Sequence, residues 1–291
     1  MVYLDNYLLT LNSKYASTYV NGSAKSNVQF NFIGLLRDDA DIIRTSLSIL
    51  NAQIPVSFYI ITANNNVFTY VYLTIFENVI IPVGNYDANT LLTYMNSQVS
   101  IHNLVFSINS SNGKINISTT APNQDIGVLA SSSSAEIFGI GPNNITVIGT
   151  PSGASIIFPY PLNLLGVKKI SIKSSSLSII AFSSVNNNYS DTICTIPADQ
   201  PAFGMISYNN QNDLNKNLLK QSVIDRVDIQ LLDENQNYLD MNNLDWSITI
   251  CLSNERIEKD RDMTTIKDIT GIIKKPLELT KDEEELKLLE K

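Results

Sequence analysis

The sequence predicts an all-β protein, an antiparallel sandwich or barrel, and three observations support this. About a dozen short runs alternate apolar and polar residues, the two-residue period of a half-buried strand. Asn, Gly, Pro and Ser, which favour turns, separate these runs. Few segments have helical spacing, and none alternates with strands in the βα pattern of a doubly wound fold. The runs are residues 28–33, 46–54, 57–63, 67–76, 104–109, 114–119, 145–150, 154–160, 168–174, 177–182, 192–197, 227–232 and 246–252.

One hairpin is explicit in the sequence. The segment from Asn109 to Gly113 joins two strand-like runs, residues 104–109 and 114–119. Its pair Asn112 and Gly113 suits the positive φ angles of a tight turn. No internal repeat is visible, which disfavours propellers and solenoids.

Three segments have helical character. The clearest is residues 87–99, where Asp87 is a candidate N-cap. Residues 133–140, with Ser134 as a candidate cap, and residues 213–223 are shorter. The apolar face of the first helix consists of Leu91, Leu92, Met95 and Val99.

The composition divides the chain into three parts. Residues 1–27 are rich in Tyr, Asn and Ser without a sustained period, which predicts an arm or a loosely attached first strand. Residues 28–252 carry the strands of the β domain, with an inserted helix and hairpin region around 85–150. Residues 253–291 form a charged, partly helical C-terminal tail.

The C-terminal tail has two open interpretations. Asn254 to Lys291 contains about 20 of the 48 charged residues, and Thr280 is a candidate cap for a helix with an acidic first turn. The tail is either a solvated, partly disordered extension or an arm that docks on a neighbouring subunit. Its candidate anchors are Leu277, Leu279, Leu286, Leu288 and Leu289.

Charge narrows the classes of partner. The net charge of −8 and the pI near 4.7, without clustered Lys and Arg, argue against specific nucleic-acid binding. Charged residues make up 16%, below the roughly 25% of typical soluble domains. Either this neutral polar surface suits faces that become buried in an assembly, or it reflects an AT-rich genome that favours Asn and Ile codons.

No segment predicts a membrane span or a signal peptide. The two longest uncharged spans, Thr45 to Phe76 and Ile137 to Val167, are interrupted by Pro and Asn and lack about 20 continuous apolar residues. A signal peptide begins with a positively charged segment, whereas this sequence has the acidic Asp5 at that place. The protein is therefore expected in the cytosol, where Cys194 and Cys251 are expected as buried thiols rather than a disulfide or metal site.

The sequence predicts no catalytic, cofactor or metal site. His102 is the sole histidine and lacks metal-ligand spacing, so a structural role is expected. No GxSxG elbow or phosphate-binding loop occurs, and residues 138–144, FGIGPNN, contain only a GxG. The chain is predicted not to be an enzyme and to need no cofactor.

Two groups of carboxylates are expected to be solvated turn residues rather than a glycosidase pair or a calcium loop. They are Asp38, Asp39 and Asp41 in the first group and Asp233 and Glu234 in the second. Four N-x-[ST] sequons are attributed to chance in a chain rich in Asn, Ser and Thr. They begin at Asn21, Asn116, Asn144 and Asn188.

Aromatic residues give the last candidates. Trp246 opens the final strand in phase with Ile248 and Ile250, which predicts a core anchor. The pairs Tyr70 with Tyr72 and Phe158 with Tyr160 are either core residues, which is favoured, or a glycan-binding patch.

Several segments, taken in order, resemble the penton or minor capsid proteins of virophages and related double-jelly-roll DNA viruses. The most specific is residues 223–252, which combines an Ile-x-Leu-x-Asp-Glu strand and turn with the Asp-Trp-Ser strand. The others are LNSKYAS (11–17), SNVQFNF (26–32), SLSILNAQIPVSFY (46–59), VIIPVGNYDANTLLTYMN (79–96), AEIFGI (135–140) and LLGVKKISIKSSSL (164–177).

This resemblance implies a single antiparallel jelly-roll β-sandwich that forms a homopentamer at the icosahedral five-fold vertex, where it packs against major capsid protein trimers and other minor capsid proteins. The expected location is the virion, after assembly in the host cytoplasm. The alternative is a β-sandwich host-attachment or glycan-binding module.

Overall fold

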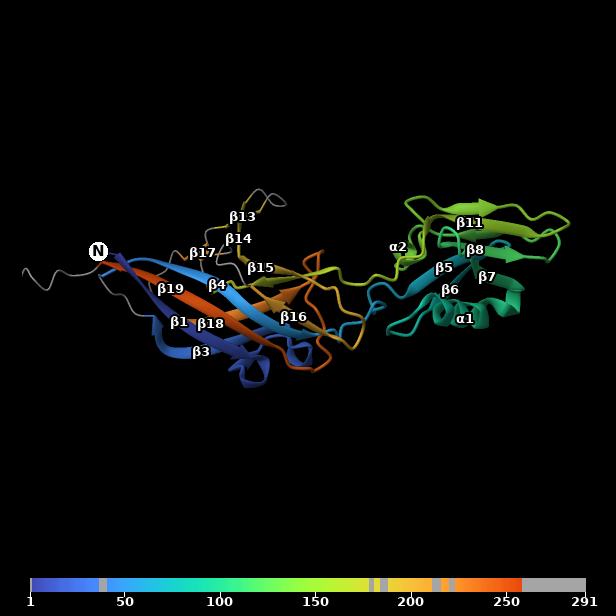
Figure 1. Cartoon of the computed structure of the whole chain (residues 1–291). Helices are drawn as coiled ribbons and strands as arrows, with labels where there is room; N and C mark the ends of the chain where they lie inside the picture. The colour runs from blue at the N-terminus through green and yellow to red at the C-terminus, as the bar shows by residue number, and fades with distance from the viewer. Residues whose placement is uncertain are drawn as a thin grey trace, which may run out of the picture.

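The computed structural model of the chain describes residues 2–36, 41–177, 181–183, 188–210, 216–219 and 223–257. It consists of two lobes that follow one another along a long axis (Figure 1). Each lobe has its own hydrophobic core. Among the residues described, no helix is long and apolar enough to cross a lipid bilayer.

The first lobe is a sandwich of two antiparallel sheets. One sheet has the order β1-β19-β4-β16, with β17 also paired to β4, and the other has the order β15-β12-β18-β3-β2. The strands of the first sheet are β1 (Val2–Asn12), β4 (Ile42–Pro55), β16 (Met205–Asn209), β17 (Asn217–Leu218) and β19 (Ser247–Ile257). Those of the second are β2 (Thr18–Tyr19), β3 (Asn27–Leu36), β12 (Lys169–Lys173), β15 (Thr192–Pro197) and β18 (Ile224–Leu232).

The connectivity of these strands is that of a jelly roll. In chain order, β1, β3 and β4 alternate between the two sheets, β12 and β15 follow in the second sheet, and β16, β18 and β19 alternate again. Two interlocked Greek keys produce this order of eight strands. The predicted jelly-roll fold is confirmed. A small hairpin of β13 (Ala181–Ser183) and β14 (Asn188–Ser190) lies between β12 and β15 in the chain.

Trp246 anchors the core of the jelly roll, as its phase with Ile248 and Ile250 predicts. Its side chain is 1% exposed and lies edge-on to the Phe30 ring, with 6.4 Å between ring centroids. The indole Nε1 donates a hydrogen bond of 2.8 Å to the Lys25 carbonyl, so the polar end of the buried ring is satisfied. The predicted role of Trp246 is therefore confirmed.

The second lobe is inserted between β4 and β12 of the jelly roll. Its sheets have the orders β10-β9-β5-β6 and β11-β8-β7. The first contains β5 (Val67–Tyr72), β6 (Ile75–Ile80), β9 (Ile126–Val128) and β10 (Ile145–Val147), and the second contains β7 (Leu104–Ile108), β8 (Lys114–Thr119) and β11 (Ala154–Pro161). Its helices are α1 (Ala88–Val99) and α2 (Ala135–Phe138).

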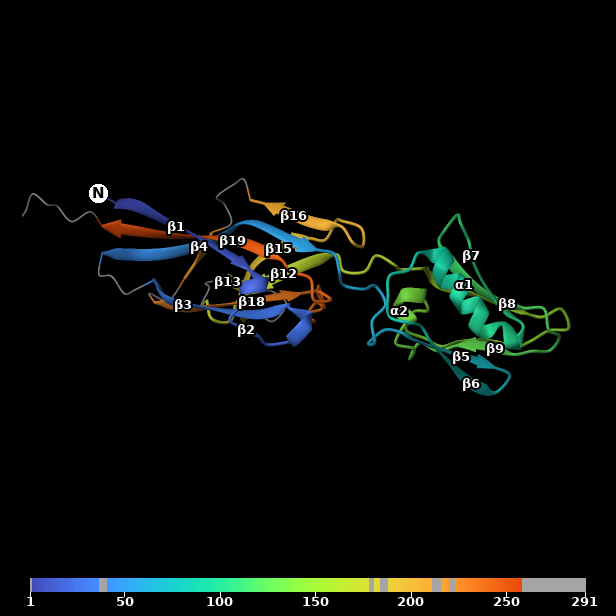
Figure 2. The ribbon, with the colours of Figure 1, turned by 90° about the horizontal axis from the view of Figure 1, so that it is seen from below.

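Helix α1 packs on the core shared by the two sheets of the inserted lobe (Figure 2). Asp87 caps it in a capping box with Thr90, and the four predicted apolar residues are buried. Asn96 ties the helix to β7, because its amide donates to the Phe106 carbonyl at 3.0 Å and accepts from the Phe106 N–H at 2.6 Å. The predicted helix over residues 87–99 is confirmed.

Several local predictions are wrong. Residues 57–63 form no strand, apart from a bridge at Ile61. The run 67–76 is a hairpin, β5 and β6, because Leu73 adopts a φ of 57° and turns the chain. Residues 217–218 of the segment expected as a helix at 213–223 form the strand β17, which pairs with β4.

Two turn details also differ from expectation. The hairpin from Asn109 to Gly113 is present, but Gly113 alone of the predicted pair has a positive φ, and its N–H donates to the Asn109 carbonyl at 2.8 Å. Ser134 precedes α2 without capping it, since its hydroxyl donates to the Val67 carbonyl instead.

The first and last described strands lie beside each other. The stretch 1–27 contains β1, which pairs with β19 along its length. The strand β19 continues past Leu252 to Ile257, and the C-terminal tail beyond it lies outside the described residues. The core of the inserted lobe begins at Ile61, ahead of the range 85–150 expected for the insertion.

Replacement of Trp246 tests the core. We expect Trp246→Ala to lower the free energy of unfolding by about 3 to 5 kcal/mol, because it leaves a cavity between the sheets. Trp246→Phe retains most of the packing and loses the bond to Lys25, so its cost is smaller. Thermal and urea denaturation measure both, and an unchanged melting temperature in Trp246→Ala contradicts the anchoring role.

Candidate assembly surfaces

The strand β1 forms an exposed apolar edge of the jelly roll. It lies at the end of its sheet, so its outer side has no neighbouring strand among the described residues. Leu9 and Leu11 point into the core, whereas Leu4 and Leu8 occupy the opposite face, with Leu8 67% exposed. A long edge strand with exposed leucines is a ready template for another chain.

A second apolar cluster lies at the opposite edge of the same sheet. The strand β16 is separated from β1 by β19 and β4. Met205 at its start is exposed, and Phe203 just before it is 83% exposed. The Phe203 ring is presented by a fixed backbone, because its N–H donates to the Val56 carbonyl at 2.9 Å.

Ion pairs lie at the end of the sheet farthest from the inserted lobe (Figure 1). Arg44 on β4 holds Glu255 on β19 with two bonds of 2.7 Å, and this hydrogen bonding lowers the pKa of Glu255. Arg256 lies 3.4 Å from Asp5, which also accepts from the Tyr7 hydroxyl and raises the pKa of Tyr7. These two ion pairs thus lie apart from Phe203 and Met205, which are beside the other end of β4.

Asp228 is a buried carboxylate that the sequence did not reveal as special. It accepts hydrogen bonds from the hydroxyls of Ser174 and Ser175, from the backbone N–H groups of Ser175 and Ser176, and from Gln230, at 2.6–3.0 Å. Burial raises the pKa of Asp228, but the hydrogen bonds from Ser176 and Ser175 outweigh it and leave the pKa at about 2. These bonds fix the turn after β12 on β18.

The histidine and the two cysteines of the chain lie among packed side chains of the two lobes. The His102 ring packs on Tyr72 with 4.3 Å between centroids. Cys194 and Cys251 are free thiols in β15 and β19; Cys251 is buried and Cys194 is half-buried, and burial raises the pKa of Cys194. Among the described residues, no group of three or more His, Cys, Asp or Glu side chains is placed to hold a metal ion.

The predicted turn carboxylates divide into described and undescribed residues. Asp38 and Asp39 lie outside the described part, and Asp41 lies in the turn before β4. Asp233 accepts the N–H groups of Asn235 and Asn237 at 2.8 Å, which confirms its place in a turn. Three of the sequon side chains also accept hydrogen bonds within the chain, those of Asn21, Asn116 and Asn144.

The two members of each predicted aromatic pair differ in burial. Tyr70 and Phe158 are buried in the inserted lobe, where Phe68 also packs against Phe158. Tyr72 is half-buried beside His102. Tyr160 is 55% exposed, although it shares the phase of Phe158 on β11. The core assignment is therefore wrong for Tyr160.

No protein-family model matches the chain, and no curated protein is similar to it in sequence. Among solved structures, the mavirus penton protein is similar with a TM-score of 0.49 and 12% identity, over 87% of this chain and 99% of that chain. A chain of the Sputnik virophage structure gives a TM-score of 0.41 and 14% identity, over 87% and 98%. VP17, a capsid protein of bacteriophage P23-77, gives a TM-score of 0.20 and 10% identity, over 88% of this chain and 100% of that chain.

Substitution of Asp228 tests its structural role. We expect Asp228→Ala to destabilise the fold by about 2 to 3 kcal/mol, because buried N–H and hydroxyl donors lose a charged acceptor. With a folded pKa of about 2 against an ordinary 3.8, the stability from ionisation is complete above about pH 4 and is lost as the pH falls towards 2. Urea denaturation across this range measures the slope.

The matched control is Asp225→Asn, an exposed carboxylate on the same strand. It should leave both the stability and its pH dependence unchanged. Asp228→Asn should remove the contribution of residue 228 to the slope between pH 4 and 2. Wild-type stability in Asp228→Ala contradicts the role assigned to the carboxylate.

Proposed function

We propose that this chain is a structural capsid protein whose jelly rolls form a homopentamer that closes the icosahedral five-fold vertices. The observation that carries the proposal is the pair of exposed apolar clusters on opposite edges of one sheet, at β1 and at β16. The jelly-roll connectivity and the resemblance of the sequence to virophage penton proteins support it.

A ring of five identical subunits requires two different faces on each subunit. One face of a subunit meets the other face of its neighbour, and the contact repeats until the ring closes. The two edges of the sheet provide such faces, with Leu4 and Leu8 on one and Phe203 and Met205 on the other. In the proposed ring, the β1 edge of one subunit contacts the β16 edge of the next.

The wider assembly follows from this ring. The flanks of the jelly roll outside the ring contacts pack against major capsid protein trimers and other minor capsid proteins in the virion, and assembly takes place in the host cytoplasm. The C-terminal tail starts from the end of β19, beside the start of β1, and is a candidate arm towards a neighbouring subunit. The chain acts as a building block rather than as an enzyme.

A host-attachment or glycan-binding module is the second candidate function. The exposed Tyr160 of the inserted lobe favours it, because exposed aromatic rings provide stacking surfaces for ligands. A pure attachment module would be a monomer or a small oligomer. A capsid protein is expected to assemble into rings of five and to be present in purified virions.

Charge placed on either edge tests the ring. We expect Leu8→Glu and Phe203→Glu each to abolish the pentamer, because a carboxylate would be buried without a partner in the contact. Both side chains are exposed, so the melting temperature should change little. Mass photometry and analytical ultracentrifugation measure the oligomer, and Ile148→Glu, an exposed position on the inserted lobe, is the matched control.

A mixture of the two variants tests the direction of the contact. The intact β16 edge of the Leu8→Glu chain can meet the intact β1 edge of the Phe203→Glu chain, so we expect one-to-one dimers and no larger species. A wild-type chain that remains monomeric at high concentration contradicts the homopentamer. Pentamers that survive both substitutions would place the contacts on other surfaces.

A further inference from the structure

The segment between β1 and β3 presents an exposed surface with two tyrosines. Tyr15 is 74% exposed, Val20 is 61% exposed and Tyr19 is 37% exposed. The Tyr19 hydroxyl donates to the Lys14 carbonyl at 3.0 Å, and the Lys14 ammonium lies 5.8 Å from the centroid of the Tyr15 ring. Val20 follows Tyr19 directly in the chain. These four residues form the tyrosine patch.

The tyrosine patch is fixed to the core of the jelly roll. The Tyr19 hydroxyl also donates to the Ser13 carbonyl at 2.8 Å. Ser13 is fully buried, and its hydroxyl donates to Asp245 at 3.0 Å and accepts from the Trp246 N–H at 3.1 Å. A partner that docks on this surface therefore orders few groups of the protein, which lowers the entropic cost of binding.

The tyrosine patch carries a local positive charge in a chain whose net charge is −8. Lys14 is exposed and makes no ion pair within the described residues. Lys25 lies 6.0 Å from the centroid of the Tyr19 ring and is paired with Asp245 at 2.8 Å. The charge of Lys14 is thus left over. An acidic segment with apolar side chains complements this surface.

One segment of the chain has this composition. Residues 277–291, in the C-terminal tail, lie outside the described residues. They contain six acidic and three basic residues, a net charge of −3, together with five leucines. Leucine side chains match the exposed tyrosine rings, and carboxylates match the ammonium of Lys14.

The chain before residue 277 is long enough for this contact. The tail follows Ile257, which lies opposite Val2 at the start of β1. The strand β1 has 11 residues, and at about 3.3 Å per residue the tyrosine patch beyond its other end is about 35 Å away. Four strands of an adjacent subunit add roughly 20 Å across the sheet. Residues 258–276 span up to about 65 Å when extended, so the segment can reach either subunit.

We propose that residues 277–291 of one subunit dock on the tyrosine patch of the adjacent subunit. This inference rests on the homopentamer proposed above and names the surface that receives the C-terminal tail. The patch is continuous with the β1 edge, because the Ser13 N–H donates to the Trp246 carbonyl at 3.0 Å and extends the pairing of β1 with β19. It therefore lies beside the edge that the proposed ring turns towards the adjacent subunit.

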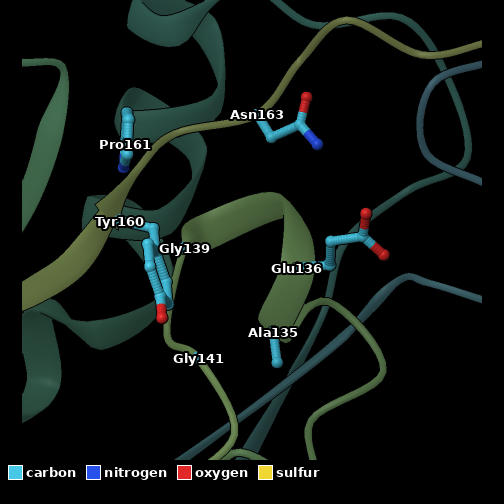
Figure 3. A pocket seen from close by; sticks show the side chains of 7 residues that line it. All are labelled: Ala135, Glu136, Gly139, Gly141, Tyr160, Pro161 and Asn163. Atoms are coloured by element: carbon cyan, nitrogen blue, oxygen red, sulfur yellow. The ribbon is translucent and has the colours of Figure 1, made fainter. Parts of the chain in front are cut away.

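Photo-crosslinking in the full chain tests the docking. The crosslinker p-benzoylphenylalanine replaces Tyr15 in one sample and Tyr160 in the matched control. Tyr160 is an exposed tyrosine of the inserted lobe, beside α2 (Figure 3). Unlabelled and nitrogen-15-labelled chains are mixed before assembly, irradiated and analysed by mass spectrometry. We expect cross-links from position 15 of one chain to residues 277–291 of a chain with the other label, and none from position 160 to this segment.

Charge reversal separates specific docking from chance contact. Lys14→Glu should lower the yield of cross-links from position 15 about five-fold or more, because it places like charges opposite each other. Replacement of Glu283, Glu284 and Glu285 by Lys in the same chain should restore most of the yield. The matched control is Lys114→Glu on β8 of the inserted lobe, which should leave the yield unchanged. Melting temperatures check that each variant is folded.

Absence of cross-links from position 15 to residues 277–291 overturns the inference, and so does a yield that Lys14→Glu leaves unchanged. Cross-links confined to chains with the same label also overturn it, because the segment would then dock on its own subunit. Mass photometry of the same samples keeps the two proposals apart. Pentamers without these cross-links refute the docking alone, whereas a chain that remains monomeric refutes the ring and the docking between subunits.

Discussion

The pairing of the first strand with the last is the constraint on which the rest of the structure depends. The strands β1 and β19 are hydrogen-bonded from Val2 opposite Ile257 to Asn12 opposite Ser247. This contact joins the first and the last of the described strands, so its formation closes a long loop of intervening chain at a cost in conformational entropy. It also places β19 between β1 and β4, where Ile248, Ile250 and Leu252 reach the core.

The same pairing explains how the chain carries a second lobe. The start of β1 and the end of β19 lie on the side of the jelly roll farthest from the insertion (Figure 1). The inserted lobe is therefore connected to the jelly roll by two segments, one after β4 and one before β12. These segments are tied down, for example by the Ser57 hydroxyl, which donates to the Met241 carbonyl at 2.8 Å. Because each lobe has its own core, surface changes in one leave the packing of the other intact.

The extent to which the sequence predicts this structure depends on how local each signal is. The alternation of apolar and polar residues predicts most strands of the jelly roll and the Trp246 anchor, because every second residue of a strand faces the core. The turn at Leu73 was missed because no Gly, Pro or Asn marks it, and a leucine with positive φ is uncommon. The Asp228 cluster was missed because its serine partners lie more than fifty positions away in the chain. Tyr160 has the two-residue phase of Phe158, but the pairing of β11 with β8 is irregular between Ile157 and Pro161, so the alternation does not predict its exposure.

In the proposed ring, the size of the apolar edges would limit how strongly two subunits associate. Burial of a large apolar side chain contributes about 1.5 to 3 kcal/mol, so the four exposed side chains proposed to meet in one contact would give on the order of 10 kcal/mol. The loss of translational and rotational freedom on association costs a comparable amount. A single contact is therefore weak. The last subunit of a ring makes two contacts while it loses its freedom once, so the closed ring gains stability that an open pair lacks. In the proposed assembly, edges of modest size would thus favour complete rings over partial ones, because an incomplete ring would dissociate before it is fixed in place.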